Sequence, residues 1–343
     1  MTASLALRHS PTISEPTRAR VRAAAQRLGY RPDPEIARLM GRLRASRLRG
    51  DSVVVALIDL QTETKPIDHP YVVRLRDGAR SRLDALGYGC TILRLRDYGD
   101  DAAALLRVVR SRGITGCILL PSNVPVTFAS ALAWDGLSVL AATTSVVSPR
   151  FHRVVPNSLF NAMTLIETMY ARGYRKIGAI LSESLEQRTA HHYSLALTWH
   201  GHRSRLLVLP DEDDAGKDVP RIAAWLRRHQ VDVLFAQNAD IVRRALRAGR
   251  MGAGRNQVGL LSLSTIDETG IACQDERPEC IGESAANLLA GMMQNNETGV
   301  PDYSRVTTVD GVFVDGPSVR PPLSGRSSGS PPRASVLPAG TIH

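Results

Sequence analysis

From residue 51 onward, short apolar runs alternate with longer amphipathic segments. The apolar runs have the length of buried strands, and the segments between them repeat apolar residues every three or four positions, as one face of a helix requires. Strands are predicted at 53–60, 90–94, 116–120, 138–142, 176–181, 206–209, 231–236 and 258–262, and helices at 70–86, 100–112, 158–172, 188–199, 218–229, 241–248 and 280–293. This alternation is typical of parallel strands joined by helices, and the number of units predicts an α/β body with two lobes.

A separate helix is predicted at 14–29, ahead of the body. Ser14 is a favourable N-cap, Pro16 lies in the first turn, and Gly29 ends the segment. One face of this helix is apolar and requires a partner. That face consists of Val21, Ala24, Ala25 and Leu28.

A short helix is predicted at 35–44, with Asp33 as its N-cap and Pro34 as its first residue. Its apolar residues exceed what a lone exposed helix tolerates: Ile36, Leu39, Met40 and Leu43. Residues 1–8 form helix readily but begin at Met1 with no cap and no preceding turn, so this element looks incomplete.

Charge is concentrated in the first fifty residues. Eleven arginines and three acidic residues give this stretch +8 of the chain's formal net charge of +10. A basic segment joined to a nearly neutral body indicates an arm that meets a polyanion, with DNA as the leading candidate. A solvated basic tail without a specific partner is the alternative, but the spacing of the apolar positions disfavours it.

The arm resembles the DNA-binding headpiece and hinge of the lactose-repressor/galactose-repressor (LacI/GalR) family of bacterial transcription regulators. Its pattern is "T-x-S-x-A-L-R … I-S-x-x-T-R-x-x-V-x-x-A-A-x-x-L-G-Y-x-P-x-x-x-A-R-x-L". The matching residues are Thr2, Ser4, Ala6, Leu7, Arg8, Ile13, Ser14, Thr17, Arg18, Val21, Ala24, Ala25, Leu28, Gly29, Tyr30, Pro32, Ala37, Arg38 and Leu39.

The resemblance implies that residues 1–8 are the remainder of a recognition helix in the major groove, and that Leu39 wedges into the minor groove. The residues expected to contact DNA are Thr2, Ser4, Leu5, Arg8, Thr12, Ser14, Thr17, Tyr30, Arg38 and Leu39. The family's first helix and turn have no counterpart, so we expect either a start codon upstream of Met1, which we favour, or a truncated regulator. Asp33 replaces a residue that is more often Asn or basic, and we expect it to cap its helix rather than bind phosphate.

The body resembles the same family's two-lobed sensing domain, of the periplasmic-binding-protein type. The passages that carry this resemblance are 154–157 with 172–178, 236–240, 275–282 and 310–316, and in total it covers about residues 1–320. Ala239 stands where the family usually has Asp. In such folds a small ligand binds between the lobes, at the carboxyl ends of the strands.

Arg188 opens the helix predicted after the strand at 176–181, where members of the family commonly have an arginine. In those proteins the guanidinium donates paired hydrogen bonds to hydroxyls or a carboxylate of the ligand. Asn238 and Asp275 occupy matching loop positions, and Tyr71 is a candidate for stacking, with Tyr193, Trp199 and Phe313 as alternatives. A surface arginine, a turn asparagine and a solvated loop carboxylate are the corresponding alternatives without a ligand. The set fits a sugar, a purine or a carboxylate equally well, and the resemblance favours a carbohydrate weakly.

Several classes of protein find no support in the sequence. No run of about 18 apolar residues could span a bilayer, and no signal peptide is recognisable, which disfavours a secreted solute receptor and predicts a cytoplasmic location. The four cysteines are expected to be free, with no disulfide or zinc site. No nucleotide-binding, hydrolase or metalloprotease motif occurs, and His191 and His192 are too close in sequence to share a metal from a helix.

These observations predict a non-enzymatic, cofactor-free repressor that binds palindromic operator DNA as a homodimer and senses a small-molecule effector. The expected divisions are a partial, truncated all-α helix-turn-helix headpiece at 1–30, a hinge helix and linker at 31–50, a two-lobed domain at 51–320 with lobes near 51–155 and 156–288, and a disordered tail at 321–343. The alternative is a cytoplasmic small-molecule-binding or enzymatic α/β protein whose basic arm contacts nucleic acid or an acidic partner non-specifically.

Overall fold

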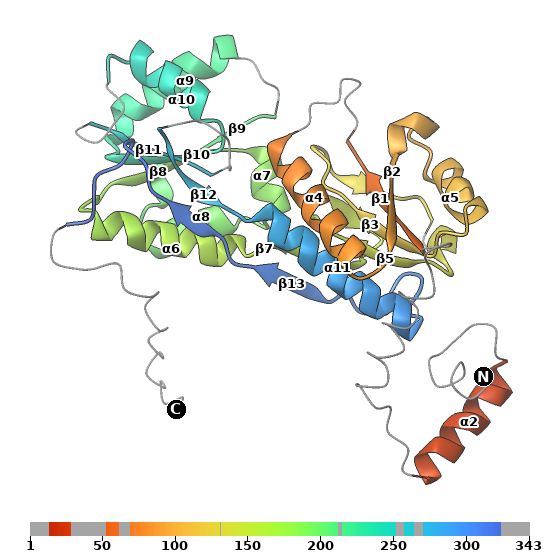
Figure 1. Ribbon diagram of the computed structural model, residues 1–343. Coiled ribbons are helices and arrows are strands. Elements are labelled where there is room, and N and C mark those ends of the chain that lie inside the picture. The colour runs from red at the N-terminus through yellow and green to blue at the C-terminus, as the bar shows by residue number, and fades with distance from the viewer. Residues whose placement is uncertain are drawn as a thin grey trace, which may run out of the picture.

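Two six-stranded sheets form the centre of the body, one in each lobe (Figure 1). They are seen in a computed structural model that describes residues 14–28, 53–61, 69–130, 132–211, 215–251, 257–263 and 270–323. The two-lobed α/β architecture predicted from the sequence is confirmed.

The sheet of the first lobe has the order β13-β7-β5-β3-β1-β2, and all of its neighbouring strands are parallel. Its strands are β1 (Val54–Asp59), β2 (Gly89–Arg94), β3 (Gly116–Leu119), β5 (Ser138–Ala141), β7 (His152–Pro156) and β13 (Val306–Val309). Helices α4 (Pro70–Ala85) and α11 (Pro278–Asn295) cover one face, and α5 (Ala102–Ser111) covers the other. Both faces are therefore buried, as the continuous apolar runs of parallel strands require.

The sheet of the second lobe has the order β14-β12-β11-β10-β8-β9, and only β14 runs antiparallel to its neighbour. Its strands are β8 (Ile177–Ser182), β9 (Leu206–Leu209), β10 (Val233–Ala236), β11 (Gly259–Ser262), β12 (Ala272–Asp275) and β14 (Val312–Val314). Helices α6 (Ser158–Ala171) and α8 (His192–Trp199) pack on one face, and α9 (Ala215–His229) and α10 (Ala239–Ala248) pack on the other.

The remaining elements are short. They are α2 (Glu15–Arg27), α7 (Glu183–Arg188), the paired strands β4 (Val126–Thr127) and β6 (Val146–Ser148), and the 3-10 helices η1 (Leu95–Tyr98), η2 (Leu132–Trp134) and η3 (Arg203–Arg205). None of the helices in the described ranges is long and apolar enough to cross a membrane.

The chain crosses between the lobes three times, after β7, after β12 and between β13 and β14. Two of the crossings are joined by hydrogen bonds. The amide of Asn157 donates to the carboxylate of Asp310 at 2.8 Å, and the backbone N–H of Gly311 donates to Asn161 Oδ1 at 2.9 Å. These bonds hold the crossings side by side, so the hinge between the lobes is a compact bundle rather than a single linker.

All eight predicted strands are present, each within two residues of its expected ends. The helix predicted at 188–199 is wrong, because it is two helices. The first, α7, ends at Arg188, and Ala190 and His191 take positive φ angles of 50° and 60°, which interrupt the helical path before α8 begins. Arg188 thus closes a helix rather than opening one.

The helix predicted at 14–29 is present as α2 and ends at Arg27. Ser14 occupies the N-cap position, but its hydroxyl lies 3.0 Å from Thr17 Oγ1 and makes no capping hydrogen bond to the backbone. The predictions for residues 1–13, 29–52 and 324–343 lie outside the described residues; they include Leu39, the short helix at 35–44 and most of the predicted tail.

Candidate ligand site between the lobes

Arg188 reaches from the second lobe to the first. Its Nη1 donates to the backbone oxygen of Ser122, in the segment that follows β3, at 3.3 Å. A guanidinium has five N–H donors, and no further hydrogen bond or ion pair engages Arg188 within the described ranges. Burial lowers its pKa, while Asp211 and Glu276 oppose that shift. The side chain therefore presents unused donors between the lobes.

Local hydrogen bonds fix the short helix that carries Arg188. The hydroxyl of Ser182 accepts the N–H of Leu185 at 3.2 Å as an N-cap. The carboxylate of Asp211 accepts the N–H of Ser184 at 3.2 Å, and Gln237 Oε1 accepts the N–H of Ser182 at 2.8 Å. Because these groups come from the carboxyl ends of three neighbouring strands, α7 is held firmly at the edge that faces the other lobe.

Glu276 lies in the second crossing, directly after β12, and is partly buried. Burial raises the pKa of its carboxyl group to about 7; Asp275 adds to the increase and Arg188 opposes it. No hydrogen bond or ion pair engages this carboxyl group among the described residues. A buried polar group without a protein partner is costly and is commonly satisfied by water or a ligand.

Two tyrosines complete the cluster, Tyr71 from α4 of the first lobe and Tyr193 from α8 of the second. Burial is the main cause that raises the pKa of both phenols, and Glu276 raises the pKa of each further. Arg188 lowers the pKa of Tyr71. These effects on the pKa values indicate that Tyr71, Arg188, Tyr193 and Glu276 lie near one another where the two lobes meet, and we call these four residues the cleft cluster.

Asp275 lies beside the cleft cluster, but its carboxylate binds protein groups. Arg74 of α4 donates to its two oxygens at 3.3 and 3.1 Å, and the N–H of Arg277 donates to Oδ1 at 2.9 Å. The same guanidinium forms an ion pair with Glu279 at 2.7 Å. Asp275 therefore ties the first-lobe helix to the second crossing, and its contact with a ligand stays a prediction.

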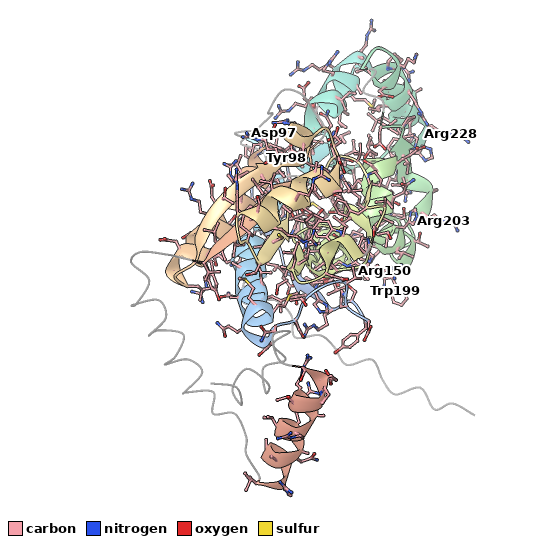
Figure 2. All side chains as sticks on the ribbon, turned by 90° about the vertical axis from the view of Figure 1, so that its right-hand side faces the viewer. Asp97, Tyr98, Arg150, Trp199, Arg203 and Arg228 are labelled. Carbon is pink, nitrogen blue, oxygen red and sulfur yellow. The ribbon has the colours of Figure 1, made fainter. Side chains whose placement is uncertain are left out.

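Asn238 is exposed at the carboxyl end of β10, where its Oδ1 accepts the N–H of Ile241 at 3.2 Å and caps α10. Its contact with a ligand also stays a prediction. Of the other aromatic candidates, Trp199 is 75% exposed at the outer surface (Figure 2), and Phe313 lies under the guanidinium of Arg172, with 4.8 Å from Cζ to the ring centre. Tyr71 and Tyr193 are thus the aromatic residues in the cluster.

The sequence predicted Arg188 and Tyr71 and named Tyr193 among the aromatic candidates, but it missed Glu276 and Ser122. An available signal for Glu276 was the acidic pair 275–276 between a strand and a helix that begins with proline. Ser122 takes part through its backbone carbonyl, for which no residue type gives a signal.

The described residues contain no group of three or more His, Cys, Asp or Glu side chains that could hold a metal ion, and all four cysteines are free. Of the residues predicted to contact DNA, only Ser14 and Thr17 are described, and both lie at the start of α2. Their contact with DNA is untested by this structure.

Replacement of Glu276 by glutamine should remove a pH dependence of stability. Because the carboxyl pKa rises from an ordinary 4.5 to about 7 on folding, the folded chain binds more protons between these values. Its stability therefore falls as the pH rises through this window and is constant above it. We expect Glu276→Gln to be more stable than the wild type by about 2 kcal/mol near pH 8, with most of the difference gone near pH 5.

Urea unfolding at both pH values measures this difference. Glu283→Gln, which removes an exposed carboxylate from α11, is the matched control. A difference between Glu276→Gln and the wild type that does not change with pH would contradict the assignment.

Comparisons with known proteins address both parts of the chain. The family model "Bacterial regulatory proteins, lacI family" matches residues 1–33. No curated protein sequence matches the chain. Among solved structures, the fold is similar to that of the lac repressor dimer bound to operator and the anti-inducer ONPF, with a TM-score of 0.61 and 13% identity over 93% of this chain and 95% of that one.

Two other structures are similar in the same way. The CelR–cellobiose complex, a transcriptional regulator, gives a TM-score of 0.58 with 17% identity over 92% of this chain and 94% of that one. A LacI family transcriptional regulator from Enterococcus faecium with bound ribose gives a TM-score of 0.57 with 15% identity over 79% of this chain and all of that one, 100%. These likenesses establish the fold of the body.

Proposed function

We propose that this chain, whose residues 1–33 match the family model of the bacterial lacI regulatory proteins, is a ligand-responsive transcription regulator. It binds operator DNA as a homodimer through its N-terminal part, and a small molecule between the lobes alters that binding. One observation carries the proposal: the same chain contains a segment that matches the lacI family model and a two-lobed body with unused polar groups between its lobes.

The N-terminal charge supports the DNA-binding half. A net +8 within fifty residues supplies the attraction for phosphates that dominates non-specific affinity. We assign residues 1–30 to the DNA-binding headpiece and 31–50 to the hinge. The solved lac repressor dimer, which has a similar fold, is bound to operator. In this proposal the protein lies in the cytoplasm and catalyses no reaction.

The cleft cluster supports the sensing half. Regulators of similar fold have been solved with cellobiose and with ribose. A ligand that touches Tyr71 on the first lobe and Arg188 on the second favours whichever arrangement of the lobes brings these side chains to it. The predicted hinge helix and linker at 31–50 lead directly into β1 of the first lobe. A change in the arrangement of the lobes therefore alters the distance between the two hinge helices of a dimer.

Leu39→Ala tests the DNA-binding half. The family resemblance predicts that Leu39 inserts at the centre of the operator, so its replacement should remove a contact that stabilises the kinked duplex. We expect the variant to bind a palindrome selected from random duplexes about tenfold more weakly, a loss of about 1.4 kcal/mol in binding free energy. Its ligand binding should be unchanged. Fluorescence anisotropy at two salt concentrations measures it.

Leu43→Ala is the control, because it removes an apolar residue of the same predicted helix away from the wedge position. Equal operator affinity for Leu39→Ala and the wild type would contradict the wedge. Binding that shows no sequence preference would instead favour the alternative, an α/β protein with a non-specific basic arm.

A further inference from the structure

The second lobe carries many positive charges at the amino-terminal ends of its parallel strands. Four segments lead into β8, β9, β10 and β11, namely 172–176, 199–205, 226–232 and 246–258. Together they contain ten lysine and arginine residues and a single acidic residue, Asp232. Eight of these ten cations are exposed or partly exposed, and we call them the basic edge: Arg175, Lys176, Arg203, Arg205, Arg227, Arg228, Arg247 and Arg250.

Contacts hold the four segments together. The one carboxylate among them accepts two backbone N–H groups of the first segment, at 2.8 and 2.9 Å. A β-carbon at Gly178, at the start of β8, would lie 3.1 Å from the ring of Trp225 in α9 and 3.2 Å from the backbone oxygen of Arg205. Helices α9 and α10 share an apolar cluster and end at the same edge of the sheet. Figure 2 shows Arg203 and Arg228 along one side of the molecule.

Helix ends account for only part of this charge. A helix dipole stabilises basic side chains in the last turn, and Arg227, Arg228 and Arg247 have that position. Helices α6 and α8 have no basic residue in the last turn. The cations that follow these two helices, and also Arg250, lie beyond the helix ends. The basic edge thus contains more positive charge than its helices require.

The positive excess holds when every nearby acid is included. Arg172 and Arg320, which lie next to the basic edge, raise the number of cations to ten. The acids are fewer even when those of segment 264–269, which lies outside the described residues, are all assigned to this edge. There are then five of them: Glu167, Asp232, Asp267, Glu268 and Asp315. The adjoining segments 252–256 and 324–343 contain arginines and no acidic side chain.

An extended polyanion fits this surface better than a single small anion. Arg203, Arg227 and Arg228 are exposed, and none of them makes a hydrogen bond or ion pair with another described residue. The planar guanidinium pairs well with phosphate oxygens, and all but one of the cations of the basic edge are arginines. An anionic membrane would also take up apolar side chains. Of the described residues here, Trp199 and Leu323 are the large exposed apolar ones, so DNA is favoured.

The basic edge points away from the end of the body that the predicted hinge enters. The chain crosses between the lobes after β7 and after β12, and Arg188, after β8, contacts Ser122, after β3. The carboxyl ends of the two sheets therefore face each other, and their amino-terminal ends point in opposite directions. The predicted hinge leads into the amino-terminal end of β1.

We propose that the basic edge binds the phosphate backbone of a DNA duplex without sequence preference, as a second site beside the N-terminal part. With one duplex at each end, the protein joins two DNA segments. This goes beyond the proposed function and does not depend on recognition of an operator.

Capture of a second duplex tests the proposal. The full chain is bound to an immobilised palindromic duplex, which occupies the N-terminal part, and is then exposed to a fluorescent duplex of unrelated sequence. We expect capture at about 50 mM salt and at least tenfold less at about 200 mM, because released counterions make phosphate binding salt-dependent. No capture at the lower salt concentration would overturn the proposal.

A triple variant identifies the surface. Replacement of Arg203, Arg227 and Arg228 by glutamine should reduce capture at least tenfold, and replacement by lysine should retain most of it. The matched control removes three exposed arginines of the first lobe and should capture the second duplex like the wild type: Arg107→Gln, Arg112→Gln and Arg150→Gln. Equal capture by the glutamine variant and the wild type would overturn the assignment to the basic edge.

Two further measurements separate the alternatives. Loading of the first duplex reports the N-terminal part, and its failure would contradict the regulator function alone. The basic edge is then tested by anisotropy with the unrelated duplex, which the glutamine variant should bind at least tenfold more weakly than the wild type. Vesicles that contain phosphatidylserine should not bind through the basic edge. Binding to them that exceeds DNA binding and is lost in the glutamine variant would overturn DNA as the partner.

Discussion

Gly282→Ala should destabilise the first lobe by about 3 kcal/mol or more. A β-carbon at this position in α11 would lie 2.0 Å from the carbonyl oxygen of Leu75 and 2.7 Å from the amide nitrogen of Ala79. Both are backbone atoms of α4, so no side-chain rotation can relieve the contact. The two helices must instead move apart, which exposes part of the apolar cluster they share with the sheet.

Gly291→Ala is a matched control on the same helix, because a β-carbon there meets nothing within 4 Å. Alanine is the better helix former, so this variant should be unchanged or more stable by about 0.5–1 kcal/mol. Urea unfolding followed by circular dichroism compares the midpoints. Similar midpoints for the two variants would show that α4 and α11 tolerate a wider separation than the structure indicates.

The same contact between helices positions the cleft cluster. Helix α4 carries Tyr71 and Arg74, and α11 begins two residues after Glu276. Substitution at Gly282, far from any ligand group, should therefore weaken ligand binding as well as stability. The site depends on a helix–helix contact that only glycine permits.

Hydrophobic pattern was sufficient to predict eight of the strands. The strands it missed are β4, β6, β7, β12, β13 and β14; β4 and β6 are only two and three residues long, and β13 and β14 have mostly exposed or partly buried residues. The split of the helix predicted at 188–199 was also missed, because Ala190 and His191 take positive φ without glycine or proline to signal it. Helix propensity does not predict a break in a helix that tertiary contacts impose.

The ligand site was predictable only in part. Arg188 was found through a family resemblance, which preserves a position and its residue type. Glu276 becomes distinctive only through burial and through Arg188, which is distant in sequence. Likewise, the pairing of Asp275 with Arg74 joins residues 201 positions apart, and nothing in either local sequence announces it. Charge balance in a cleft is a property of the fold rather than of any segment.

Arg188→Ala should weaken ligand binding about 100-fold, which is close to 2.8 kcal/mol. The guanidinium is the cation of the cleft cluster, and its unused donors make charge-assisted hydrogen bonds that water replaces poorly in a partly buried site. Arg188→Lys keeps the charge but loses the planar fork, so we expect an intermediate loss. The measurement is calorimetric titration with the compound that binds the wild type most tightly.

Two comparisons distinguish a loss of ligand contacts from a loss of structure. Arg203→Ala, which removes an exposed arginine from the outer surface of the second lobe (Figure 2), should bind ligand like the wild type. Arg188→Ala should unfold within about 1 kcal/mol of the wild type, because the hydrogen bond it loses, to Ser122 O, is long at 3.3 Å. If Arg188→Ala bound ligand as tightly as Arg203→Ala, the arginine would serve only to bridge the lobes, and the ligand would have to be held by Glu276 and the two tyrosines alone.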